Sequence, residues 1–443
     1  MNELRLFLPC AAGVEEFLAQ EVHQLTGLAG EDLRSSRGGV SVRGSWRDAL
    51  KLNLHSRLAQ RVLVELAHAG YRSENDLYAI ASGVAWEIWF TPRETFKIET
   101  TAQHSPLTSL NFATLRIKDA IADRFRAKAG GVRPSIETQW PDCRVFAHLT
   151  TDTCTLYIDT SGEPLFKRGW RQDKGDAPLK ETLAAAMLAA SGWWNPETGE
   201  VSAAPLYDPC CGSGTIAIEA AQIALGLAAG GQRRFGFEKL LPVQTHVWGG
   251  LQADAEREAA ARSTAAPAIF GSDVSHRMVD FAQRNAERAG VAAAIDFRGG
   301  DALQRMPPAE GGVIMLNPPY GERIEVGGVA ARGARGPVRP RVGVADDAPH
   351  ARDMAHDHQP PRAPHAAGRE QAQTEDGGEF FVQLASHWKR NYAGWTAWML
   401  TPDLQCPKRM RLKESRRVPM WNGPIECRLF RFDMVAGSAR GRT

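Results

Sequence analysis

The stretch that decides the fold is Asp208-Pro209-Cys210-Cys211-Gly212-Ser213-Gly214-Thr215. A short apolar run, 205 to 208, leads into it, and an apolar helical pattern from Thr215 to Gly226 follows, which predicts a strand, a turn and a helix. Glycines let the backbone approach a ligand closely, and the N–H groups of a helix start bind anionic groups such as a carboxylate. The lysine of a phosphate-binding loop is absent, and the glycine spacing differs from that of a dinucleotide fold. Taken alone, the stretch is also compatible with a tight turn that binds nothing.

Alternating strands and helices continue downstream of this turn. Strands are predicted at 268–271, 295–298 and 313–316, and a helix is predicted from Ser275, as its N-cap, to Ala289. This alternation is typical of a doubly wound parallel sheet with helices on both faces, so the fold class is α/β with a Rossmann-like domain. Ligands of such sheets bind at the carboxyl ends of the strands.

Two acidic residues follow the next predicted strands. Asp273 closes the second strand, where a carboxylate can accept hydrogen bonds from both hydroxyls of a ribose. Asp301 follows the third strand, where it can accept from an adenine amino group. Either residue alone is more often a turn or helix-cap residue. In this order after a carboxylate-binding turn, they predict a groove for S-adenosylmethionine.

The most specific motif is Asn317-Pro318-Pro319-Tyr320, directly after the fourth predicted strand. An exocyclic amine on a base is a poor nucleophile because its lone pair is delocalised. The Asn317 side-chain oxygen and the Pro318 carbonyl can accept its two hydrogens, proline rigidity fixes that carbonyl, and Tyr320 offers a face to the extracted base. By itself the tetrapeptide could be a proline-rich turn. Residues 321–323, Gly-Glu-Arg, either contact the target nucleotide or order the loop.

The first third of the chain predicts a smaller α+β module. An alternating strand, a helix and a second strand occupy its start, and two strands are predicted at 144–150 and 153–160. Between them, 106–130 predicts a helix with a basic outer face; its apolar stripe is Leu110, Ala113, Ile117 and Ile121.

Two further basic segments stand out, at Lys167 to Lys174 around Trp170, and at Lys408 to Arg417. For each segment, a phosphate-binding surface and a bland structural role are both open.

Composition excludes several classes of protein. The 443 residues carry a net charge of +2 with 43% hydrophobic residues, which fits ordinary folded domains and means that nucleic acid would be held by local basic patches. Seven scattered cysteines without paired spacing favour a reducing cytoplasm and predict no metal site. No membrane span or obligate protein partner is predicted. Residues 326–379 are rich in Ala, Gly and Pro and hold no aromatic residue, which predicts a disordered low-complexity insertion; a metal role for its four histidines is disfavoured.

The chain resembles the bacterial THUMP-domain guanine-N2 RNA methyltransferases, and among them most closely those that act on 23S rRNA of the large ribosomal subunit. The similarity spans nearly everything except 326–379. The matching stretches are Leu-Pro-Cys-Ala-Ala-Gly-Val-Glu at 8–15, Ala-Pro-Leu-Lys-Glu-Thr-Leu-Ala-Ala at 177–185, the Asp208 turn, Phe-Gly-Ser-Asp at 270–273, Asn-Pro-Pro-Tyr-Gly-Glu-Arg at 317–323 and Trp-Asn-Gly-Pro-Ile-Glu-Cys at 421–427. Cys210 departs from the bulkier apolar residue more common in the family.

The resemblance implies a ferredoxin-like plus THUMP RNA-binding module at 1–160, a linker at 161–176, and a class I methyltransferase domain at 177–325 and 380–436. It raises the expectation that the helix at 107–130 and the 167–174 segment contact RNA. The residues implied to bind S-adenosylmethionine are Asp208, Gly212, Gly214, Asp273, Asp301 and Thr182; those implied to bind the target guanine are Asn317, Pro318, Pro319 and Tyr320. A tRNA guanine-N2 methyltransferase, an adenine methylase of DNA and a non-catalytic ribosome assembly factor are the alternatives.

Overall fold

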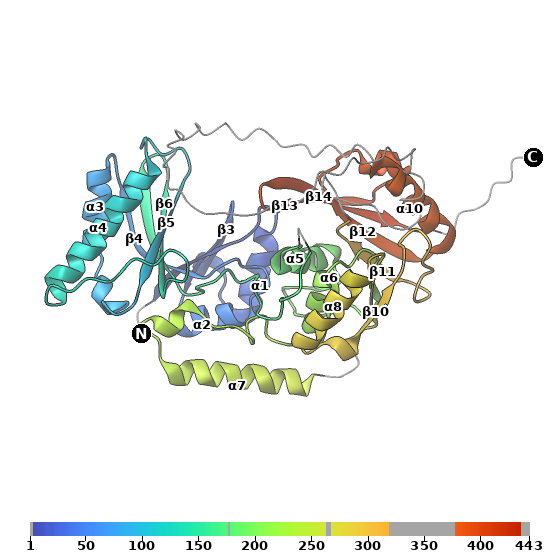
Figure 1. Cartoon of the computed structure of the whole chain (residues 1–443), viewed down its shortest axis with the longest axis horizontal. Helices are drawn as coiled ribbons and strands as arrows, with labels where there is room; N and C mark the ends of the chain where they lie inside the picture. The colour runs from blue at the N-terminus through green and yellow to red at the C-terminus, as the bar shows by residue number, and fades with distance from the viewer. Residues whose placement is uncertain (1–2, 176–177, 263–266, 319–376, 436–443) are drawn as a thin grey trace, which may run out of the picture.

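The computed structural model describes residues 3–175, 178–262, 267–318 and 377–435. In these ranges the chain forms two seven-stranded sheets, one in each half of the molecule (Figure 1). Pro319, Tyr320, residues 321–323 and nearly all of the predicted insertion lie outside the described residues. Helix α10 (Gly377–Asn391) includes the last three residues, 377–379, of that predicted insertion.

The first sheet has the strand order β2-β3-β1-β4-β7-β6-β5. Its pairs are antiparallel except for β5 and β6, which run parallel. The pairing of β4 with β7 joins the two parts of the N-terminal module into one continuous sheet. Its strands are β1 (Leu4–Pro9), β2 (Leu33–Ser36), β3 (Gly39–Gly44), β4 (Leu63–Gly70), β5 (Phe96–Ala102), β6 (Cys143–Leu149) and β7 (Thr153–Asp159).

Four α-helices accompany this sheet: α1 (Glu15–Thr26), α2 (Trp46–His55), α3 (Glu74–Gly83) and α4 (Leu110–Lys128). The predicted helix between 106 and 130 is confirmed as α4, and Ser109 caps it by accepting from the Phe112 amide at 3.2 Å. The predicted apolar stripe is wrong at one of its four positions. Leu110 is exposed, because it lies in the first turn, and the buried face continues instead through Ala120 and Phe125.

The second sheet has the order β10-β9-β8-β11-β12-β14-β13. Its first five strands are parallel, and β14 runs antiparallel between β12 and β13. The strands are β8 (Leu206–Asp208), β9 (Ile269–Asp273), β10 (Ile295–Gly299), β11 (Gly312–Leu316), β12 (Trp395–Thr401), β13 (Arg416–Asn422) and β14 (Ile425–Asp433). The helices that accompany it are α5 (Glu181–Ser191), α6 (Thr215–Ala224), α7 (Thr245–Ala261), α8 (His276–Arg288), α10 and α11 (Cys406–Met410). This topology confirms the predicted α/β fold.

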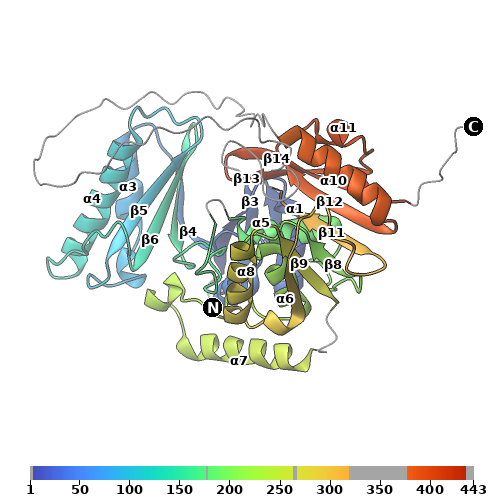
Figure 2. The same ribbon diagram turned by 45° about the vertical axis from the view of Figure 1, so that its right-hand side comes forward.

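Helices cover this sheet on both faces, as Figure 2 shows for α6 and α8 on one side and α10 on the other. Successive residues of one strand explain why: Met315 in β11 joins the core that includes α5 and α6, whereas its neighbours Ile314 and Leu316 join the core under α10. Strand residues point to alternate faces, so a strand buried on both sides reads as a continuous apolar run.

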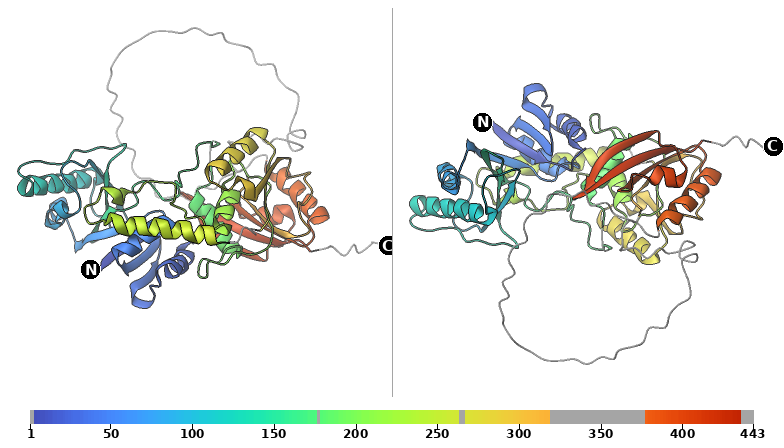
Figure 3. Two further views of the ribbon diagram at one scale, coloured as in Figure 1. Left: turned by 90° about the horizontal axis from the view of Figure 1, so that it is seen from below. Right: turned by 90° about the horizontal axis from the view of Figure 1, so that it is seen from above.

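The two halves share one of these cores. The cluster that contains β1, α1 and α2 residues continues without a break into α5 and α6. Helix α7 packs along α2, and the long β13–β14 hairpin reaches from the second sheet toward the N-terminal module (Figure 3). The two halves are therefore held together by a buried apolar contact.

Candidate active site

The predicted site residues meet at one edge of the second sheet. Asp208 ends β8, Asp273 ends β9, Asp301 follows β10 and Asn317 follows β11, and these four strands are neighbours in the order β10-β9-β8-β11. Burial, together with the nearby charges of Asp208, Asp273 and Asp301, raises the pKa of the Cys210 thiol well above its usual range. Adjacent Cys210 and Cys211 are therefore protonated thiols beside the turn.

Backbone hydrogen bonds fix the glycine turn. The Cys211 amide donates to the Ser272 carbonyl at 2.9 Å, and the Gly212 amide donates to Oδ2 of Asp273 at 3.0 Å. Oδ1 of Asp273 accepts from the Ser275 amide at 2.9 Å. Ser275 is the N-cap residue of α8, as predicted, but its side chain makes no capping bond. Asp273 thus links two strand-to-helix turns, and each of its oxygens keeps a lone pair for a ligand.

Glycine is required at the second of the two turn glycines. Gly214 is the N-cap of α6 with a φ of 88°, and a Cβ at this position would lie 3.0 Å from the Cβ of Ala282. Gly212 also has a positive φ, 51°, yet a Cβ there would meet nothing within 4 Å. The turn therefore packs tightly against α8 on one side and leaves open space on the side where a cofactor is predicted.

Asp208 is buried, with a relative exposure of 2%. Burial, together with the nearby Asp273, raises its pKa to about 8, although the Cys210 amide donates to its Oδ1 at 3.1 Å. A carboxyl group with so high a pKa is partly neutral near pH 7, and a cationic ligand beside it favours the charged form. The α-amino group of S-adenosylmethionine is a cation of the required kind.

Asp301 occupies a turn at the end of β10. Its Oδ1 accepts from the Leu303 amide at 2.9 Å, and its carbonyl accepts from the amides of Gln304 and Arg305 at 2.9 Å. Asp301 is therefore a turn residue, and the turn orients its carboxylate at the edge of the sheet.

Two residues that the sequence did not single out hold the turn from outside. Arg171 donates to the Ser213 hydroxyl at 2.7 Å and to the Thr215 hydroxyl at 2.8 Å, and it is paired with buried Glu181 at 2.8 Å. Asn285 of α8 is fully buried and donates to the Ser213 carbonyl at 3.1 Å. The sequence does not predict these contacts, because Asn285 is a single polar residue in an amphipathic helix and Arg171 is one of several basic residues in its segment.

The basic segment 167–174 is mostly structural, which corrects the expectation that it contacts RNA as a whole. Arg168 is 1% exposed and binds Glu219 of α6 at 3.0 Å, and the same carboxylate binds Arg57 of the N-terminal module at 3.1 Å. Trp170 is also buried. A buried charge requires a partner of opposite charge, and here that partner, Glu219, lies far away in the sequence. The local pattern of basic residues around a tryptophan therefore cannot predict that Arg168 is buried. Only Lys167 and Lys174 of its cations are exposed.

Asn317 differs from every other polar group of the site. Its side-chain Oδ1 is buried and accepts no hydrogen bond from any described residue. Pro318, the next residue, is buried. A buried acceptor without a donor costs about 1–3 kcal/mol, and such atoms call for an explanation. A ligand that donates an N–H is the simplest one.

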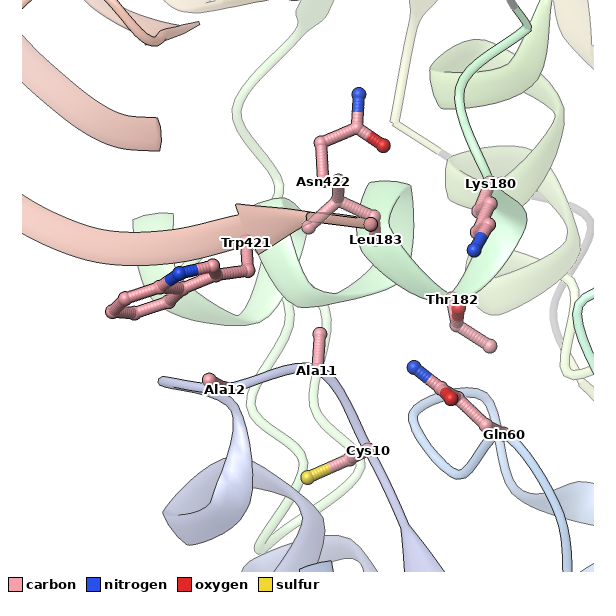
Figure 4. A pocket seen from close by; sticks show the side chains of 10 residues that line it. Cys10, Ala11, Ala12, Gln60, Lys180, Thr182, Leu183, Trp421 and Asn422 are labelled. Atoms are coloured by element: carbon pink, nitrogen blue, oxygen red, sulfur yellow. The ribbon is translucent and has the colours of Figure 1, made fainter. Parts of the chain in front are cut away.

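The structure places Thr182 at the N-terminal end of α5. It is buried in the first turn of α5 and lines a pocket of about 200 Å³ with Lys180 and Gln60 on one side. The loop 10–12 of the N-terminal module and the tip of the β13–β14 hairpin close the other sides (Figure 4). A cofactor role for Thr182 stays a prediction.

No group of three or more metal-ligating side chains occurs in the described ranges, and the predicted histidine tract lies outside them. None of the seven cysteines forms a disulfide. In the part of the chain that the structure describes, no helix is long and apolar enough to cross a membrane.

Comparison with known proteins identifies the parts of the chain. Residues 5–63 match the RlmL ferredoxin-like domain, residues 71–159 match the THUMP domain, and residues 168–330 match the RMKL-like methyltransferase domain. The fold and the site therefore define a methyltransferase that carries a THUMP module.

Relatives narrow this class. The chain is 33% identical over 430 residues to the ribosomal RNA large subunit methyltransferase K/L of Psychromonas ingrahamii, which covers 96% of this chain and 49% of that protein. It spans about half the length of the curated relatives it matches. Among solved structures, SMU.472 in complex with SAH has a TM-score of 0.76 at 23% identity, covering 98% of both chains. A protein of Clostridium difficile 630, described as a possible methylase, has the same TM-score at 25% identity and full coverage of both chains. The chain belongs to the family of THUMP-domain methyltransferases.

Proposed function

We propose that this protein transfers a methyl group from S-adenosylmethionine to the exocyclic N2 of a guanine in 23S rRNA. The observation that carries the proposal is the side-chain oxygen of Asn317 at the end of β11, which is buried and has no hydrogen-bond partner among the described residues. Strand β11 is the neighbour of β8, whose end leads into the glycine turn. The names of the curated relatives, which are large-subunit rRNA methyltransferases, support the substrate class. A cytoplasmic location follows from that substrate.

The described residues fit the cofactor. The open side of Gly212 and the N-terminus of α6 suit its carboxylate, the raised pKa of Asp208 suits its amino group, and Asp273 and Asp301 suit its ribose and adenine. When bound, S-adenosylmethionine supplies a methyl group on a sulfonium, which is the electrophile.

The role of Asn317 follows from the chemistry of the acceptor. Its Oδ1 and the Pro318 carbonyl accept the two hydrogens of the guanine amine, so the nitrogen lone pair is turned toward the methyl group. Bound S-adenosylmethionine would supply the methyl group to this nitrogen, and the methylated nitrogen would then lose one proton to solvent. The guanine must leave its stack to reach this point, and Pro319 and Tyr320 remain the predicted face against which it rests.

The proposal competes with three others. A tRNA guanine-N2 methyltransferase would use the same two modules. An adenine methylase of DNA would use a similar loop. A ribosome assembly factor would keep the fold but would catalyse no methyl transfer. The partnerless Asn317 oxygen favours a catalytic role over the last of these.

The test is incubation of the purified chain with methyl-labelled S-adenosylmethionine and, separately, unmodified 23S rRNA and bulk tRNA, followed by digestion and nucleoside mass spectrometry. Labelled N2-methylguanosine from rRNA alone is expected. Label in tRNA alone would move the substrate to the tRNA family, and labelled methyladenosine would contradict the assigned nucleophile.

A further inference from the structure

A groove of about 580 Å³ is lined by the stretch 163–181, which leads from the first sheet into α5, and by Arg233 and Arg234. Seven cationic and two anionic side chains line it. Both anions are already paired: Glu163 binds Lys167 at 2.5 Å, and buried Glu181 binds Arg171. The remaining charge of the groove is therefore strongly positive, although the whole chain is close to neutral.

Four of the cations, Lys174, Lys180, Arg233 and Arg234, form no ion pair with a carboxylate of the described residues. Lys174 and Arg234 are exposed, and the ammonium of half-buried Lys180 lies 5.1 Å from the ring centre of Phe166. Arg233 lies beneath them, and its guanidinium donates to the backbone carbonyls of the 161–167 turn, including Pro164 at 2.7 Å. These charges are held apart on separate segments of the chain, so they offer a row of binding points for several anions.

The groove also contains a half-buried aromatic ring, Phe166, beside its cations. Cations that follow a backbone, next to an aromatic face, are the recognition pattern of single-stranded nucleic acid. Its wall includes Arg171, which holds Ser213 and Thr215 of the cofactor turn, and Lys180 also lines the pocket of Figure 4. A strand in the groove would therefore lie beside the methyl-transfer site.

We infer that this groove, with Lys174, Lys180 and Arg234 as its phosphate-binding residues, holds the backbone of a single-stranded RNA segment next to the target guanine. The inference rests on the proposed function for the identity of the polyanion. It replaces the predicted RNA contact over the whole 167–174 segment by a surface that the stretches 163–181 and 233–234 build together.

The test compares two matched double variants. Lys174→Glu with Arg234→Glu removes two groove cations, whereas Arg34→Glu with Arg43→Glu makes the same charge change at exposed positions of β2 and β3 that do not line the groove. Binding of a labelled, unmodified single-stranded 23S rRNA fragment is measured by filter retention across a salt series. S-adenosylmethionine affinity and melting temperature are measured in parallel to show that both variants are folded.

The groove variant is expected to bind RNA about tenfold more weakly, and its slope of log affinity against log salt should fall by about 0.7 for each lost phosphate contact. The control variant should keep the slope of the unmodified chain. Equal affinity and slope in the groove variant would overturn the inference. This readout is independent of turnover: a chain that binds RNA through the groove but methylates nothing would refute the proposed function and leave the groove standing.

Discussion

The cofactor turn and the acceptor residue, although they lie at neighbouring strand ends, are built in opposite ways. In the turn, the amides of Cys211, Gly212 and Gly214 all have acceptors. At the end of β11, the oxygen of Asn317 is buried and accepts from no described residue. The difference indicates that the protein itself fixes the turn, whereas Asn317 lacks a donor, which is the place that the proposed function gives to the target amine.

Replacing Arg171 should disturb the turn most. Arg171→Ala removes the donor to Ser213 and Thr215 and leaves Glu181 buried without its partner. Breaking a buried pair costs about 3–5 kcal/mol, so we expect a lower melting temperature and about hundredfold weaker S-adenosylmethionine binding in calorimetry. Arg171→Lys keeps the charge but loses the several N–H donors of the guanidinium. Its melting temperature and cofactor affinity should lie between those of Arg171→Ala and those of the unmodified chain. Unchanged cofactor affinity in both variants would show that the turn is fixed without Arg171.

A smaller effect is expected at Gly214. Gly214→Ala places a Cβ 3.0 Å from Ala282 at a φ of 88°, and should destabilise the protein by about 2 kcal/mol and weaken cofactor binding about tenfold. Gly290→Ala is the matched control, because its φ is 73° but its Cβ would meet nothing within 4 Å. Chemical denaturation of both variants separates the cost of the backbone from that of the contact. Equal losses would mean that packing against α8 is unimportant.

The smallest effect is a pH dependence that belongs to Asp208. The unfolded chain releases this proton near pH 4, whereas burial keeps the pKa at about 8 in the folded protein, so the free energy of unfolding contributed by Asp208 falls as pH rises between these values. Cofactor binding favours the ionised form, and affinity should tighten about tenfold from pH 6.5 to 8.

Asp208→Asn should flatten both profiles, measured by calorimetry and by thermal melting. A profile that keeps its slope in this variant would assign the titration to another group, such as Asp273, whose pKa burial also raises.

Much of the fold and of the catalytic edge could be predicted from the sequence, because strand alternation and the residues that end each strand are local features. The strand ends at Asp208, Asp273 and Asn317 are examples. Partners distant in sequence could not be predicted. The sequence around Glu219 does not indicate that this residue binds both Arg57 and Arg168. These two ion pairs bury Arg168, a residue of the basic segment 167–174.

The acceptor role of Asn317 is the central claim, and Asn317→Ala tests it most directly. Single-turnover methylation of unmodified 23S rRNA and calorimetric S-adenosylmethionine binding are measured on the same preparations of the variant and the unmodified chain. We expect the methylation rate to fall about 100-fold or more, since a preorganised acceptor is lost, while cofactor affinity changes less than about twofold. A variant that methylates at the normal rate, or that loses cofactor binding as well, would contradict the account.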